Sequence, residues 1–229
     1  MREENNLFNL TDKIEEVQAF SRADDISKSI GLQEDTVLQG RYIIEKKISQ
    51  NSESFSYLGF DKVHDKKIHI REFFPKDFCK REKDFSVTVE NKDEFNIYLS
   101  DFLGFFRSIA KLKEVAVVQQ VYDIFKENST AYVVSEWIEG MTFERFIEKN
   151  NEPMTWEEAK YIFMPVLSAL RTINSLKVQH LGVSPEHLII GQDSKMHLIG
   201  FSTKNACQCG NFSTWQISKI GRASCRERV

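Results

Sequence analysis

Side chains that could bind a metal ion gather near the end of this 229-residue chain. Cys207 and Cys209 form the one metal-like cluster in the sequence. A structural zinc site needs four ligands, typically from two paired motifs, and this chain offers one pair. His197 and Cys225 could complete the set only by coincidence. We therefore predict no metal site.

Two further stretches carry the spacing of a catalytic site without its side chains. Residues 179–188 read QHLGVSPEHL, and residues 198–202 read LIGFS. They resemble the catalytic and metal-binding loops of protein kinases, whose signatures are H-R-D-x-x-x-x-N and D-F-G. By this resemblance Gly182 and Gly200 replace the two aspartates, and His187 replaces the asparagine. His180 is retained, and in kinases that histidine mainly organises the loop.

Three other strings support the resemblance and fall in the expected order. Residues 37–44 (VLQGRYII) are similar to the entry to the first strand of bacterial serine/threonine kinases. Residues 70–75 (IREFFP) are similar to their third-strand lysine segment, and residues 130–140 (TAYVVSEWIEG) to the strand and hinge that hold adenine. The match covers residues 37–205. It implies a two-lobed α+β fold, with a complete N-lobe and a partial helical C-lobe.

The nucleotide-binding positions depart from the kinase pattern. The phosphate-covering loop should read G-x-G-x-x-G, because glycine lets backbone amides approach the phosphates. Ser49, Asn51 and Ser54 stand there instead, and they suit a plain β-turn. By the same resemblance, the remnant of the nucleotide pocket consists of Ser49, Asn51, Ser54, His69, Arg71, Ser135, Glu136 and Ile138.

The residues at two of these positions, and one residue in the predicted helix of residues 92–112, are unfavourable for normal nucleotide binding. Arg71 replaces the lysine that pairs with phosphate, and arginine is longer and forked. His69 replaces a small alanine and would crowd the base. The glutamate that should pair with the lysine aligns with Phe105, which cannot hold a cation. Arg71 therefore needs another partner or points at solvent.

The chemistry of phosphoryl transfer also lacks its usual groups. Magnesium requires hard oxygen ligands in octahedral geometry, but Gly200 offers no side chain and His187 offers nitrogen. The substrate hydroxyl needs a positioned proton acceptor, and Gly182 cannot be one. We expect neither magnesium nor another cofactor to be bound, with ATP binding in the absence of magnesium left open.

From these losses we expect that the chain is not an enzyme. It is predicted to be a pseudokinase that serves as a scaffold or regulatory module in bacterial signalling. Its partner would be a protein, such as another kinase, bound at the substrate groove or at the helix of residues 92–112. Two alternatives remain: an atypical active serine/threonine kinase that binds ATP with relocated catalytic residues, and a truncated fragment without function.

Hydrophobic periodicity predicts the elements that position these residues. Short β-branched or aromatic runs separated by polar turns predict five antiparallel strands, at residues 41–48, 55–60, 67–73, 121–125 and 131–136. A helical pattern at residues 92–112 follows the third strand, and further helical patterns appear at residues 143–147 and 156–176. A mostly β unit followed by a helical unit favours an α+β fold over alternating βαβ units.

Composition narrows the class of protein. The net charge of −3 gives no reason to expect nucleic-acid binding, which needs a basic face. No stretch approaches 18 uncharged apolar residues, so no membrane span is predicted within the chain. The acidic N-terminus is not a secretory signal, and the four cysteines show no disulfide framework. We expect a cytoplasmic protein, although kinases of this bacterial type often carry a membrane span downstream.

Four segments are expected along the chain. Residues 1–35 form an N-terminal extension with one short amphipathic helix after Thr11. Residues 36–138 form the kinase-like N-lobe, and residues 139–219 the partial C-lobe. Residues 220–229 (IGRASCRERV) resemble the translation of a sequencing adapter, so we expect them to be an artefact.

Overall fold

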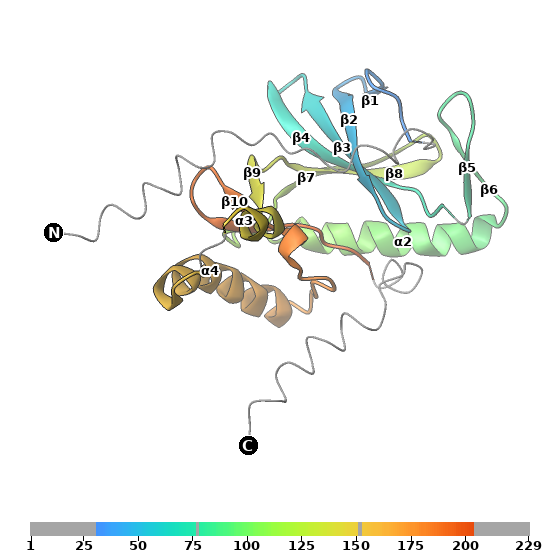
Figure 1. The fold of residues 1–229 in the computed structure, drawn as a ribbon. Coiled ribbons are helices and arrows are strands. Elements are labelled where there is room, and N and C mark those ends of the chain that lie inside the picture. The colour runs from blue at the N-terminus through green and yellow to red at the C-terminus, as the bar shows by residue number, and fades with distance from the viewer. Residues whose placement is uncertain (1–30, 77, 151–152, 204–229) are drawn as a thin grey trace.

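A computed structural model describes residues 31–76, 78–150 and 153–203 of the chain (Figure 1). Its first part is an antiparallel six-stranded sheet in the order β1-β2-β3-β4-β8-β7. The strands are β1 (Val37–Leu38), β2 (Tyr42–Gln50), β3 (Ser54–Asp61), β4 (Lys66–Phe73), β7 (Val121–Glu127) and β8 (Thr130–Glu136). The α+β fold with a kinase-like N-lobe is confirmed.

The five predicted strands all form, and their bounds differ from the predicted ones by two residues or fewer. The sixth strand, β1, was not predicted, because two residues carry too little alternation to be recognised. The turn between β7 and β8 consists of two residues. Asn128 and Ser129 both have positive φ, as a tight two-residue hairpin requires.

Helix α2 (Lys92–Ile109) packs beneath the sheet, against β7 and β8 (Figure 1). It begins at Asn91, whose side chain accepts a hydrogen bond from the backbone amide of Glu94. It ends three residues before the predicted position, although Leu112 is still buried in the core. Its buried face is built from Phe95, Leu99, Phe102, Leu103, Phe106 and Ile109.

A short hairpin that periodicity did not predict lies beside the sheet, near the start of α2 (Figure 1). It consists of β5 (Cys79–Arg81) and β6 (Val87–Val89), which are too short to show a pattern. Arg81 reaches from it to the carboxylate of Glu72 on β4, at 2.7 Å. That carboxylate also accepts hydrogen bonds from the hydroxyls of Tyr57 and Tyr132, so a wholly buried polar network fixes the hairpin to the sheet.

The second part of the structure contains the smaller elements and two helices. A three-stranded sheet has the order β11-β10-β9. Helix α4 begins with a capping box between Thr155 and Glu158, which satisfies the first backbone amides of the helix. The elements are β9 (Gly140–Thr142), α3 (Phe143–Lys149), α4 (Trp156–Ser175), η1 (Pro185–His187), β10 (Leu188–Gly191) and β11 (Met196–Leu198).

Several predictions lie outside the described residues. They are the helix after Thr11, the cysteines at 207, 209 and 225, and the adapter-like residues 220–229. Within the part of the chain that the structure describes, no helix combines the length and apolarity needed to cross a membrane.

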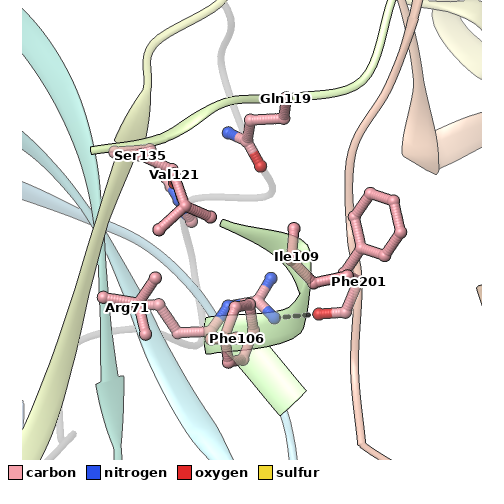
Figure 2. Close-up of a pocket in the computed structure, with 9 residues that line it drawn as sticks. Arg71, Phe106, Ile109, Gln119, Val121, Ser135 and Phe201 are labelled. Carbon is pink, nitrogen blue, oxygen red and sulfur yellow. Dashed lines mark hydrogen bonds between the residues drawn. The ribbon is translucent and has the colours of Figure 1, made fainter. Parts of the chain in front are cut away.

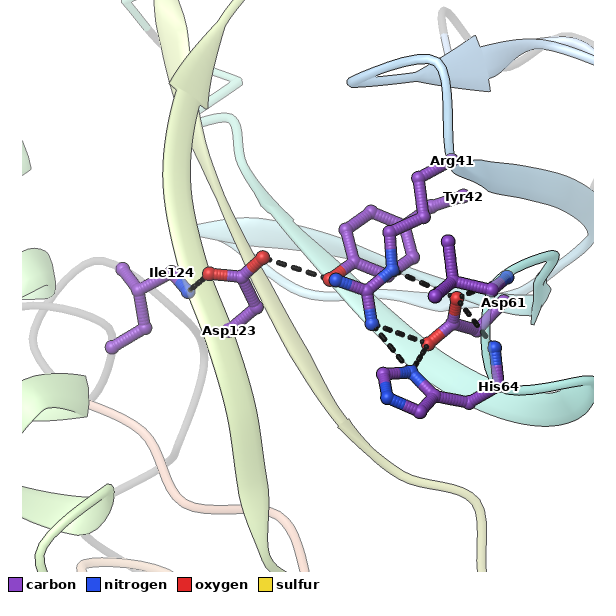
Figure 3. Close-up of polar contacts among 7 residues, drawn as sticks. Arg41, Tyr42, Asp61, His64, Asp123 and Ile124 are labelled. Atoms are coloured by element: carbon purple, nitrogen blue, oxygen red, sulfur yellow. Dashed lines mark hydrogen bonds and ion pairs between the residues drawn. The ribbon is translucent and has the colours of Figure 1, made fainter.

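An ionic cluster joins the residue before β2 to the end of β3 and to the turn that follows it (Figure 3). The Arg41 guanidinium donates two hydrogen bonds to the carboxylate of Asp61, at 2.8 and 2.7 Å. His64 Nδ1 lies 2.8 Å from the same carboxylate, and its backbone amide also points at it. Beside the cluster, the Tyr42 hydroxyl donates to Asp123 at 2.7 Å.

We expect this cluster to make the stability of the protein fall in acid. The hydrogen bonds from Arg41 hold the pKa of the buried Asp61 carboxyl well below its usual value. The folded state therefore favours the ionised form, and its stabilisation is present above the usual carboxyl pKa of about 4 and lost as the pH falls through the lowered pKa. The free energy of unfolding, measured with urea, should fall less steeply between pH 7 and pH 3 for Asp61→Asn than for the wild type. An equal slope would contradict this prediction, and Asp93→Asn, at an exposed carboxylate, is the control.

Candidate functional site

A small cavity lies where β4, β8 and α2 meet the segment after β11 (Figure 2). We call it the interlobe cavity. Its walls include a cation from β4, an aromatic ring from α2 and a second ring from the segment after β11. The residues that line it are His69, Arg71, Phe106, Ile109, Gln119, Val121, Val133, Ser135 and Phe201.

Arg71 is the cation of the interlobe cavity, and it is buried with 8% of its surface exposed. It has a partner: its guanidinium donates a hydrogen bond to the backbone carbonyl of Phe201 (Figure 2). The guanidinium carbon also lies 5.2 Å from the centre of the Phe106 ring, in a cation–π contact. Burial lowers the pKa of Arg71, and the charge of Glu53 opposes that effect. The cavity therefore holds a cation suited to an anionic ligand.

Phe105 is the residue aligned with the missing glutamate. No hydrogen bond or cation–π contact joins it to Arg71 in the described part of the chain. It is half-buried, and its ring meets Phe106 edge-on at 5.3 Å. Phe106 is the ring that lies under Arg71. Sequence reasoning missed it, because one residue along a helix turns the side chain by about 100°.

His69 and Ser135 form one wall of the interlobe cavity. They are cross-strand partners on β4 and β8, and His69 Nδ1 lies 3.1 Å from the Ser135 hydroxyl. Burial, with a smaller effect of the Arg71 charge, lowers the pKa of His69 to about 3, so the imidazole is neutral. The two side chains add hydrogen-bonding groups at a position where the kinase pattern has a small apolar residue.

The end of β8 is hydrogen-bonded to the residues before β7. The Gln119 side chain donates to the backbone carbonyl of Glu136 at 2.8 Å. The Glu136 carboxylate accepts from the backbone amide of Gln120 at 3.4 Å. Ile138 follows in the half-buried connection to β9. Gln119 thus belongs to the site, although no sequence motif singled it out.

The turn between β2 and β3 is closed by one asparagine. Asn51 Oδ1 accepts hydrogen bonds from the backbone amides of Glu53 and Ser54, at 2.9 and 2.7 Å, and from the Ser54 hydroxyl at 3.1 Å. Ser49 is exposed and pairs with Ser56 across the strands. Since Asn51 already uses two amides, the turn in this conformation does not offer them to a phosphate.

Glu53, at the tip of this turn, is a buried carboxylate with 5% of its surface exposed. One oxygen accepts a hydrogen bond from the Thr203 hydroxyl, and the other, Oε2, has no hydrogen-bond partner among the described residues. Burial raises the pKa of Glu53, while Thr203 and the charge of Arg71 oppose that rise. Sequence reasoning missed Glu53 and Thr203. A charged residue in a turn of serine and asparagine was the only signal.

His187 and Gly200 form one packing unit. The His187 imidazole points its Nδ1 at the Gly182 carbonyl, at 2.5 Å, and at the Ser184 hydroxyl, at 3.1 Å. Gly200 has φ +79°, and a Cβ there would overlap the His187 ring, with Cγ only 2.5 Å away. The imidazole therefore fills the space that a side chain at position 200 would need.

This arrangement does not fit magnesium. Positions 182 and 200 carry no side chain, and the imidazole of His187 is turned toward protein groups. In the described ranges, no three His, Cys, Asp or Glu side chains lie close enough together to hold a metal ion. His197 makes a contact of 3.0 Å with Asp193 instead.

His180 is placed as a structural residue. Its Nε2 lies 2.6 Å from the carbonyl of Ile199, and its ring meets the Phe201 ring edge-on at 4.5 Å. Burial is the main cause that lowers its pKa to about 4, so the ring is neutral and donates from Nε2. It thereby holds the segment 199–201 against the loop that precedes η1.

Known proteins are similar to this chain in sequence and in fold. Serine/threonine-protein kinase PknL of Mycobacterium bovis is 26% identical over 182 residues, 79% of this chain. Serine/threonine-protein kinase PrkC of Bacillus subtilis is 24% identical over 169 residues, 74% of this chain. The solved structure titled PpkA-294 apo form superposes with a TM-score of 0.68 at 20% identity, and covers 86% of this chain and 67% of that one. No protein-family model matches.

The chain spans 41% of the length of PknL and 24% of the length of PrkC. Both relatives are named protein kinases. These names contradict the expectation that the chain is not an enzyme. That expectation rested on the replacement of the kinase residues at positions 71, 105, 182, 187 and 200 and in the loop of residues 49–54.

Proposed function

The chain belongs to the protein kinase superfamily, and from that premise we propose that it binds a nucleoside triphosphate between its lobes as a serine/threonine-kinase-type signalling domain. The observation that carries the proposal is Arg71. It is a buried cation on β4 that faces Phe201, at the position from which kinases hold phosphate. Burial disfavours the charged form of Arg71 more than the charge of Glu53 favours it, so a further anion at this place would be stabilised.

The proposed binding mode is independent of magnesium. The two positions that would supply its ligands carry no side-chain oxygen, as glycine and histidine stand there. Phosphate binding would rest on Arg71 and on groups of the segment 201–203. Transfer of the phosphoryl group would need a carboxylate at another position. Of the buried carboxylates in the described residues, Glu53 is the one near Arg71, since Asp61 and Glu72 bind other partners.

The test is thermal and chemical unfolding of the purified protein with ATP. At about one hundred times the dissociation constant, ATP should add about 2.7 kcal/mol to the stability, equally with magnesium and with a chelator. Arg71→Met should abolish the gain, and Arg107→Met, at an exposed arginine on α2, should preserve it. Absence of any gain at millimolar ATP in the folded wild type would refute the proposal, as would a gain that a chelator removes.

We also propose a scaffold role toward a protein partner, supported by exposed apolar side chains on α4. Tyr161, Met164 and Leu167 are each more than half exposed, and Trp156 is 74% exposed. Helix α2, the surface expected to bind a partner, turns its apolar face inward and exposes only Ile97 strongly. Contiguous apolar surface of this kind marks interaction sites.

A photo-crosslinking residue at position 164 of the full-length protein tests this second proposal. Crosslinks to another protein would support it. Crosslinks confined to other segments of the same chain would contradict it, because the face would then be covered from within. A cytoplasmic location is part of the proposal, since ATP and signalling partners of kinases are found there.

A further inference from the structure

We propose that the Glu53 side chain is a built-in competitor for the anion site at Arg71, which a ligand's phosphates must displace. This inference rests on the proposed nucleotide binding and adds the regulation of that site. It concerns a residue to which the kinase resemblance assigns no role. Four observations carry it.

The first observation is where the side chain goes. Glu53 lies at the tip of a turn between two strands, yet it is 95% buried, because its carboxylate reaches the Thr203 hydroxyl. The two residues are 150 positions apart in the chain. The contact therefore joins the turn between β2 and β3 to the segment after β11.

The second observation is that the backbone of the turn is held separately. Asn51 closes the turn, and the Glu53 carbonyl accepts a hydrogen bond from the backbone amide of Phe74 at 2.7 Å. The Glu53 side chain can therefore leave Thr203 while the turn stays folded. Its contact with Thr203 holds the turn to the segment after β11, and the pairing of β2 with β3 does not depend on it.

The third observation is charge. Glu53 and Arg71 interact electrostatically, and Arg71 donates to Phe201, two residues before Thr203. A phosphate that approached Arg71 would meet a carboxylate of the same sign, within a poorly solvated site. The carboxylate now provides the counter-charge that a phosphate would provide.

The fourth observation is that the Glu53–Thr203 contact leaves one carboxylate oxygen without a hydrogen bond. Glu53 Oε2 is buried without a hydrogen-bond partner among the described residues. A buried polar atom in this state is costly, and the cost disappears when the side chain moves to solvent. Displacement by an anionic ligand removes this cost and so offsets part of the loss of the Thr203 contact, as a reversible competitor requires.

The experiment compares Glu53→Gln and Glu53→Ala with the wild type, using isothermal titration with ATP and with inorganic tripolyphosphate. Glutamine removes the charge and keeps the shape, and alanine removes both. We expect at least tenfold tighter binding for Glu53→Ala and an intermediate gain for Glu53→Gln. Glu45→Gln, at an exposed carboxylate on β2, should bind as the wild type does. Unfolding curves establish that each variant is folded.

The outcomes separate this inference from the proposed function. Binding by the wild type with no gain in either Glu53 variant overturns the inference and leaves the nucleotide proposal standing. Binding gained only when Glu53 is replaced supports the inference, and shows that the wild-type cleft is closed to nucleotide. No binding by any variant overturns both. A loss of binding in Glu53→Gln also overturns the inference, because Glu53 would then assist the ligand.

Discussion

Gly200→Asp is expected to destabilise the protein by about 3 kcal/mol, the sum of a backbone cost and a packing cost. Gly200 has φ +79°, which side-chain-bearing residues rarely adopt, and a Cβ there overlaps the His187 ring. Restoring the aspartate of the kinase pattern therefore damages this protein. Urea unfolding of the purified variant measures the loss.

Two comparisons isolate the packing cost. Gly40 also has positive φ, +62°, but nothing lies within 4 Å of a Cβ there, so Gly40→Asp should lose only the backbone part, about 1 kcal/mol. His187→Asn should rescue most of the packing loss in the Gly200→Asp background, with a coupling of about 1–3 kcal/mol. Additive effects of the two substitutions would show that His187 and Gly200 do not share one space.

Glu72→Gln is expected to cost about 3–5 kcal/mol, because it removes the buried carboxylate that pairs with Arg81 and accepts from two tyrosine hydroxyls. Glu72 is wholly buried, and its carboxylate accepts from Arg81, Tyr57 and Tyr132 at 2.7–2.8 Å. The loss should appear in urea unfolding. Hydrogen exchange should rise in β5 and β6, which Arg81 joins to the sheet.

The control for this prediction is the exposed pair of the same hairpin. Lys80 and Glu90 lie 2.9 Å apart with both side chains largely in solvent, so Glu90→Gln should cause no measurable change. Combining Glu72→Gln with Arg81→Met should recover much of the stability, because both members of the buried ion pair are then removed. Failure of the double variant to recover would indicate that the tyrosine hydrogen bonds matter more than the ion pair.

These two sites bear differently on the function. The Glu72 network lies on the face of the sheet away from the interlobe cavity and sets stability alone. The His187–Gly200 unit lies where a kinase holds magnesium. Histidine is larger than the asparagine of the kinase pattern and glycine is smaller than its aspartate, so the two replacements compensate each other in volume. A single reversion is therefore a poor test of lost chemistry, and ligand binding to the intact site is the better one.

The sequence by itself determined the elements and their order. The short runs of β-branched or aromatic residues at 67–73 and 131–136 depend only on neighbours in the chain, as does the helical spacing of Phe95, Leu99 and Phe102. β4, β8 and α2 accordingly formed at the predicted places. The elements that were missed, β1 and the β5–β6 hairpin, have two or three residues per strand, too few to show a period.

Only the tertiary structure decided how the site is filled. Arg71 bonds to a carbonyl 130 residues away, and Glu53 to a hydroxyl 150 residues away, so no local pattern could pair them. Likewise, the ring under Arg71 proved to be Phe106 and not its neighbour, because the rotation of α2 is set by packing against β7 and β8. Residue types show which catalytic groups are missing from a site. Which side chains occupy the places of those groups depends on contacts that exist only after the lobes have packed.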